Sequence, residues 1–227
     1  MFSEFLLDTY ILDFKCDEIK EIIKENKWRM MDAEEAIKAI YEFVRDRVKY
    51  SIPYKPNLKA SDVLKIMKGD SYTKAIFLMA LLRGSGIPAR LHLYKVYKHL
   101  MFGILDKKHL HTLPDELNHF VVEAYLDKEW ISLEGVILDS RYVDGLKEIL
   151  LHRTGAYIGY GMGVNDINKI DIEYHHEGSF IRSRAISSDV GIYSSPDELS
   201  DRISCEFSLL NTFFINRKLK AIRNGKN

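Results

Sequence analysis

Apolar residues recur at helical spacing through the first fifth of the chain. Residues 16–28 place isoleucines three and four positions apart among Lys and Glu, which predicts an amphipathic helix. A second apolar stripe begins after Asp32 and predicts a helix as far as Lys49. Asp32 and Glu35 have the spacing of a capping box, in which each side chain satisfies a backbone N–H at the start of the helix.

The next two segments predict one short helix and one buried helix. Ser61 can cap a helix that continues through Met67, and Gly69 can end it in a left-handed conformation. Residues 71–83 are almost continuously apolar after the first turn. This run is too long for a typical strand, so we expect a helix that is buried on all sides and ends at Gly84.

The hydrophobic period then changes to that of strands. Residues 91–97, 119–126 and 130–133 each form a short β-type run, and residues 127–129 form a tight connection between the last two. Helices therefore precede strands rather than alternating with them. This order predicts an α+β fold with an antiparallel sheet.

The pattern is weaker beyond Ser140. Residues 141–153 predict a helix, and residues 154–196, rich in Gly, Ser, Asp and Tyr, predict surface loops with short strands. Residues 197–223 regain a helical period. With no repeat or low-complexity linker, we expect residues 1–227 to form a single domain.

Composition narrows the class of protein. Apolar residues make up 46% and charged residues 29%, which is typical of a folded globular chain. The net charge of zero provides no long-range attraction to nucleic acid or to an anionic membrane, so we expect neither as a partner. The two cysteines, Cys16 and Cys205, cannot build a disulfide framework. With no secretory signal pattern and no apolar run of 18 residues, we expect a cytoplasmic protein.

Three segments carry residues suited to nucleophilic catalysis. The first, GDSYTKA at residues 69–75, opens the buried helix, and the second, LLRGSGIPAR at residues 81–90, closes it. The third, HFVVEAY at residues 119–125, is followed by Trp130 and Glu134.

The physical argument starts from Ser71, at the predicted helix N-terminus. The positive end of the helix dipole and free backbone N–H groups favour a developing negative charge there. His119 on a nearby strand could accept the proton of the nucleophile, and a carboxylate could orient the imidazole. Glu134 follows His119 by 15 positions, which suits a hairpin whose second strand returns beside the first.

In this order the three segments resemble the transglutaminase-like branch of the papain-like cysteine peptidase superfamily. The resemblance covers residues 33–139 and leaves residues 140–227 as an extension. It implies a papain-like core with a helical lobe packed on an antiparallel sheet. It also implies acyl transfer or hydrolysis of an amide or peptide carbonyl by Ser71, His119 and Glu134, without a cofactor. The implied partner is a peptide, protein or small amide substrate.

The sequence departs from the family pattern at two positions. Ser71 stands where the resemblance implies Cys, and Glu134 stands where it implies Asp. Three explanations remain open for Ser71: a natural pseudoenzyme, a deliberate replacement of cysteine, or a working Ser-His-Glu hydrolase. Because serine gains little from dipole activation, we expect the chain to be inactive or strongly impaired.

Each candidate residue also has a structural interpretation. Ser71 could be only a helix cap, His119 only a strand-end residue, and Glu134 only a turn residue. Two functions of other classes therefore stay open: a non-catalytic module that binds a peptide in the same cleft, and a scaffold whose 197–223 helix docks a partner. The oligomeric state is left open, and no metal site is predicted.

Two further segments are expected to wall the cleft. The apolar insertion at residues 99–117 joins two strands near the site, so its ends must lie close to Ser71. The Gly-rich stretch around Tyr160 could approach a substrate backbone closely, because glycine has no side chain.

Overall fold

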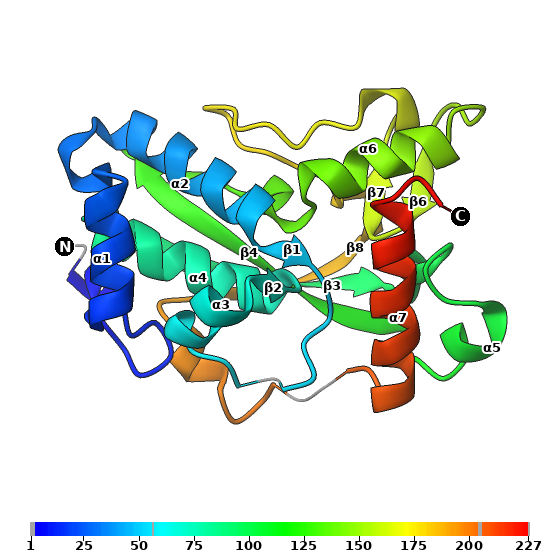
Figure 1. Ribbon diagram of the computed structural model, residues 1–227, viewed down its shortest axis with the longest axis horizontal. Helices are drawn as coiled ribbons and strands as arrows, with labels where there is room; N and C mark the ends of the chain where they lie inside the picture. Colours follow the sequence, from blue (N-terminus) through cyan, green and yellow to red (C-terminus); the bar gives the residue numbers. More distant parts are fainter. Residues whose placement is uncertain (1–2, 56, 204–205, 227) are drawn as a thin grey trace.

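A computed structural model describes residues 3–55, 57–203 and 206–226. A helical layer packs on one face of a four-stranded antiparallel sheet (Figure 1). The helices of this layer are α1 (Asp17–Glu25), α2 (Ala33–Arg47), α3 (Ala60–Ile66) and α4 (Ser71–Gly84). The predicted α+β fold class is therefore confirmed.

The sheet has the strand order β5-β4-β3-β8. Its strands are β3 (Ala89–Tyr97), β4 (Glu116–Leu126), β5 (Glu129–Ser132) and β8 (Ile186–Tyr193). Asp127 and Lys128 join β4 to β5 with left-handed φ values of 50° and 72°. Such a turn matches the twist of the two strands and returns β5 beside β4, so that Glu134 comes back toward His119.

Helix α4 forms the centre of the first hydrophobic core. Every residue from Tyr72 to Gly84 is buried, which explains why the sequence gives this helix no polar face. Its apolar side chains pack against Phe120, Val122 and Ala124, the residues of β4 that point to the helical side of the sheet.

A second hydrophobic core is formed mainly by elements that follow β3 in the sequence, which lie on the right-hand side of Figure 1. Most of the apolar residues of the 99–117 insertion are buried there. The elements around this core are η3 (Lys98–Met101), α5 (Lys107–Leu110), α6 (Ser140–Ile149), β6 (Tyr157–Gly159), β7 (Met162–Val164) and α7 (Leu209–Ile222).

The remaining elements are short. Strands β1 (Lys49–Tyr50) and β2 (Lys68–Gly69) pair in parallel immediately before α4. The 3₁₀ turns are η1 (Ser3–Leu6), η2 (Trp28–Met30), η4 (Glu134–Ile137), η5 (Ile167–Lys169), η6 (Ser183–Ala185) and η7 (Pro196–Leu199). Within the described ranges no helix is both long enough and apolar enough to cross a bilayer.

The capping interactions predicted for two helices, α2 and α3, are wrong. Asp32 precedes α2, but its side chain makes no capping hydrogen bond. Lys59, not Ser61, is the N-cap residue of α3, because the Ser61 hydroxyl instead donates to Asp13 at 2.6 Å. Helix α3 ends at left-handed Met67, and Gly69 belongs to β2.

Two larger errors concern the last third of the chain. Strand β8 pairs with β3 inside the segment expected to be surface loop with short strands, because its Ser- and Gly-containing sequence has little hydrophobic period. The predicted 197–223 helix is split into η7 and α7. Cys16 lies just before α1, whereas Cys205 falls outside the described residues.

Candidate functional site

A cleft opens at the N-terminus of α4, and Ser71 lies in its wall as the first residue of that helix. The cleft consists of two adjoining hollows with volumes of about 50 and 40 Å³. Each has room for a few water-sized groups. The residues that line both hollows are Ile52, Asp70, Ser71, Asn118, Glu206 and Phe207.

Two carboxyl groups beside Ser71 give this wall an acidic character. Asp70 caps α4 and accepts hydrogen bonds from the Thr73 backbone N–H at 3.0 Å and the Thr73 hydroxyl at 2.9 Å. Burial raises the pKa of Asp70 despite these bonds. Burial also raises the pKa of Glu206 to about 7, although the Asn118 backbone N–H donates to it at 2.7 Å. Negative charge on either group disfavours an anionic nucleophile at position 71.

His119 and Glu134 form a buried pair. The distance between His119 Nε2 and Glu134 Oε1 is 2.7 Å, and the imidazole is completely shielded from solvent. Backbone N–H groups of Ile181 and Arg182 donate to the other Glu134 oxygen. Burial opposes ionisation of Glu134, but these bonds and His119 hold its pKa below the usual value. Burial lowers the pKa of His119, which favours the neutral imidazole.

The second nitrogen of this imidazole is occupied by Arg182. The Arg182 guanidinium donates to His119 Nδ1 at 3.2 Å, to the Gly161 carbonyl at 2.7 Å and to the Tyr50 hydroxyl at 3.4 Å. A guanidinium can only donate, so Nδ1 must carry the lone pair and Nε2 the proton. In this arrangement His119 has no free lone pair with which to accept a proton from Ser71.

The structure therefore brings two of the three predicted site residues into direct contact. No hydrogen bond between Ser71 and His119 occurs in the part of the chain that is described, and Arg182 lines the Ser71 cleft while contacting His119. The catalytic role of Ser71, His119 and Glu134 stays a prediction.

Sequence reasoning missed Arg182, Asp70 and Glu206. The Asp-x-x-Thr spacing around Asp70 is a helix-start signal that could have been found. No comparable pattern marks Arg182 or Glu206.

The prediction about the cleft walls is correct for one segment and wrong for the other. Leu100, Met101 and Leu117, at the two ends of the insertion, line the cleft. The Gly-rich stretch does not line either hollow. Gly161, with φ of +80°, instead packs against the Tyr50 ring, and its carbonyl holds Arg182. Its missing side chain serves internal packing rather than contact with a ligand.

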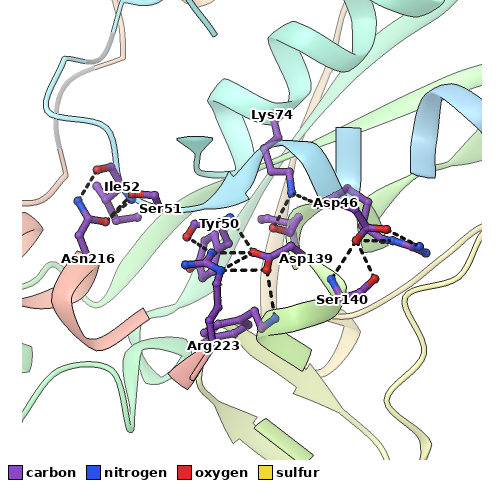
Figure 2. A network of polar contacts seen from close by, with 12 residues as sticks. Asp46, Tyr50, Ser51, Ile52, Lys74, Asp139, Ser140, Asn216 and Arg223 are labelled. Carbon is purple, nitrogen blue, oxygen red and sulfur yellow. Dashed lines mark hydrogen bonds and ion pairs between the residues drawn. The ribbon is translucent and has the colours of Figure 1, made fainter. Parts of the chain in front are cut away.

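A polar network fixes the Tyr50–Ile52 segment of the cleft wall from behind (Figure 2). Arg223, just after α7, forms an ion pair with Asp139 at 2.6 Å. Asp139 also accepts from the Tyr50 backbone N–H at 3.0 Å. The amide oxygen of Asn216 accepts from the Ile52 N–H at 2.8 Å. Helix α7 thus holds a segment that lies more than 150 positions earlier in the chain.

Lys74 lies one turn after Ser71 but points away from the cleft, toward this network (Figure 2). Its Nζ donates to the carbonyls of Arg45 at 2.9 Å and Ile137 at 3.3 Å. Burial lowers the pKa of Lys74 to about 7. The Ser-x-x-Lys spacing therefore places no amine against the Ser71 hydroxyl.

Comparison with known proteins identifies the family. The sequence profile of the transglutaminase-like superfamily matches residues 22–135, half of the chain. The chain belongs to this superfamily. The matched region contains Ser71, His119 and Glu134, together with helices α2 to α4 and strands β3 to β5 of the sheet.

A solved structure shows that the fold extends beyond this region. It is a protein from Cytophaga hutchinsonii that carries a provisional cysteine-protease name, and its TM-score is 0.52 at 14% sequence identity. The alignment covers 88% of this chain and 49% of that protein, so the present chain spans about half its length. At this identity the similarity establishes the fold alone. No curated protein matches the sequence.

Proposed function

We propose that this transglutaminase-like domain is catalytically silent and binds a peptide in the cleft beside Ser71. The observation that carries the proposal is the contact between Arg182 and His119 Nδ1 at 3.2 Å. A general base needs a free lone pair within reach of the proton that it accepts. With Nε2 bonded to Glu134 and Nδ1 bonded to Arg182, His119 cannot act as this base.

Two features of the nucleophile position support the same proposal. Ser71 replaces the thiol on which the family chemistry depends, and serine requires a strong base for activation. The carboxyl groups of Asp70 and Glu206 line the same cleft, and in their ionised forms they oppose formation of an alkoxide or an oxyanion. Binding requires neither a nucleophile nor a base, and the cleft remains lined by apolar and polar groups suited to a peptide.

Acyl transfer or amide hydrolysis is the second candidate function. The retained His119–Glu134 contact of 2.7 Å favours it, because this pair orients an imidazole for catalysis. Catalysis by this route requires Arg182 to leave Nδ1 of His119, so that the lone pair faces Ser71.

An acylation assay separates the two functions. The Ser71→Cys variant is incubated with p-nitrophenyl acetate, and mass spectrometry measures acetylation of each cysteine. For a silent domain, Cys16 and the new thiol react at similar, slow rates. Acetylation at position 71 that exceeds acetylation of Cys16 by about a hundredfold, followed by turnover, would show that Arg182 does not block His119 and would remove the observation that carries the proposal.

Peptide binding is measured separately on the wild-type chain. A library of random pentapeptides is passed over the immobilised protein, and bound peptides are eluted and sequenced by mass spectrometry. We expect intact peptides to be retained by the wild type and lost in Ser71→Trp, whose indole fills the cleft. Replacement of Ser188, an exposed serine on β8, by Trp is the matched control.

A further inference from the structure

Arg182 is a buried cation without a carboxylate partner. Its side chain belongs to a residue only 5% exposed, yet its guanidinium contacts a carbonyl, an imidazole and a phenol. Buried charges in proteins are normally paired with opposite charges. Three other arginines, of which Arg45 is buried and the other two are partly buried, follow that rule: Arg45 with Asp46 and Glu173, Arg90 with Glu123, and Arg223 with Asp139.

Arg83 is the informative exception. It is also buried, and it donates to the carbonyls of Leu7, Ala89 and Ser194. Arg83 lines neither hollow of the cleft, and its bonds tie three chain segments together. Arg182 differs from Arg83 because it lines the same hollow as Ser71. In the described residues no ion pair includes Arg182, so a cationic residue lines the cleft without a counter-charge in contact.

We propose that Arg182 binds the carboxylate of a peptide ligand in the Ser71 cleft. This inference deepens the proposed binding function and rests on it. A carboxylate matches the planar fork of a guanidinium and would give Arg182 the counter-charge that it lacks in the protein itself. The ligand carboxylate would lie beside Arg182, at the wall formed by Tyr50 and Leu117.

The other residues of the cleft determine which charge the rest of the peptide ligand can carry. Asp70 and Glu206 line the same hollow as Arg182. Arg182 can offset repulsion between these groups and one ligand carboxylate in contact with it, but a second ligand carboxylate meets repulsion from Asp70 and Glu206 when they are ionised. A neutral or basic neighbouring residue avoids this repulsion. The preferred ligand is therefore a peptide with one carboxylate and an uncharged or cationic remainder.

Four synthetic tripeptides test this inference by calorimetric titration. The first two are acetyl-Ala-Lys-Ala as the free acid and as the C-terminal amide, which differ only in the carboxylate. The other two are acetyl-Ala-Glu-Ala as the free acid and as the amide. The Glu amide presents a side-chain carboxylate alone, and the Glu free acid presents two negative charges.

We expect the affinity for the Lys free acid to be at least about tenfold higher than that for its amide, because a charge-assisted hydrogen bond is lost in the amide. The Lys free acid should also bind more tightly than the Glu free acid. If the Glu amide binds as tightly as the Lys free acid, the site takes a side-chain carboxylate as well as a terminal one. Equal binding of the Lys acid and the Lys amide would overturn the inference.

The Arg182→Gln variant assigns the effect to this residue. The difference between acid and amide should disappear in Arg182→Gln, persist in part in Arg182→Lys, and persist fully in Arg184→Gln. Arg184 is an exposed neighbour whose guanidinium contacts Asn165. A difference that survives in folded Arg182→Gln would contradict the inference, and circular dichroism establishes the fold of each variant.

The outcome also separates this inference from the function on which it rests. Retention of library peptides regardless of their terminal carboxylate would leave the binding function standing and remove the role of Arg182. Failure of every library peptide and every tripeptide to bind would overturn both.

Discussion

Two arginines contact Tyr50, one at its backbone carbonyl and one at its hydroxyl group, and they differ in their other partners. Arg223 contacts the Tyr50 backbone carbonyl and forms two-point contacts with the Asp139 carboxylate (Figure 2). Arg182 contacts the Tyr50 hydroxyl at 3.4 Å and otherwise reaches only neutral acceptors. One guanidinium group therefore has a carboxylate in contact, and the other does not.

This difference separates a structural residue from a candidate binding residue. The Arg223–Asp139 pair has its charge satisfied, and its loss would leave an uncompensated charge inside the protein. Arg182 has no carboxylate in contact, so its removal should affect stability less. Its position at the cleft then makes ligand binding the property most affected by substitution.

The largest expected effect on stability comes from breaking the ion pair between Arg223 and Asp139. Asp139→Asn should lower the free energy of unfolding by about 3–5 kcal/mol, because Arg223 is left without its carboxylate. Urea unfolding followed by circular dichroism measures the change. Asp115→Asn is the control, since Asp115 is exposed and its pair with Lys98 should contribute less than about 1 kcal/mol. Equal changes in the free energy of unfolding of the two variants would show that the Arg223–Asp139 pair does not stabilise the fold more than an exposed pair does.

The pH dependence of stability gives an intermediate effect through Lys74. Its pKa is about 7 in the folded chain and 10.5 without burial. Between these values the unfolded chain binds a proton that the folded chain does not, so stability rises with pH. Below pH 7 both states are protonated and the contribution is constant.

Comparison of the wild type with Lys74→Met isolates this contribution. Between pH 7.5 and 9.5 the wild type should gain about 1 kcal/mol of unfolding free energy per pH unit relative to the variant. Urea unfolding at several pH values measures both slopes. Parallel slopes would mean that Lys74 stays charged in the folded chain.

The smallest expected effect on stability comes from replacing Arg182. Arg182→Gln should change the free energy of unfolding by less than about 1 kcal/mol, because relief of a buried charge offsets the lost hydrogen bonds. Urea unfolding at pH 7.5 tests this expectation. A loss as large as that of Asp139→Asn would make Arg182 a structural residue and remove the contrast between the two arginines.

Much of the fold could be predicted from the sequence because strong local patterns specify it. The continuous apolar run after Ser71 required a helix buried on all sides, and α4 has that property. Strand β8 could not be predicted, because its pairing with β3 depends on a long-range partner rather than on its own period. The break before α7 was missed because residues 197–223 keep apolar spacing across the turn.

The candidate site could be predicted only in part for a similar reason. The 15-position spacing of His119 and Glu134 reflects a local hairpin, so their contact follows from the sequence. Arg182 reaches His119 from 63 positions away, and the surrounding Gly- and Ser-rich sequence contains no signal of that contact. The same limit applies to Arg223, which meets Asp139 across 84 positions.

The position of Arg223 late in the chain has a consequence for biosynthesis. A ribosome releases the chain from its N-terminal end, so α4, β3 and β4 can associate while α7 is still inside the ribosomal tunnel. During that interval Asp139 lacks its guanidinium partner, and the Tyr50–Ile52 segment lacks the contacts from Asn216 and Arg223. The cleft beside Ser71 can therefore be completed only after residue 223 has been translated and released.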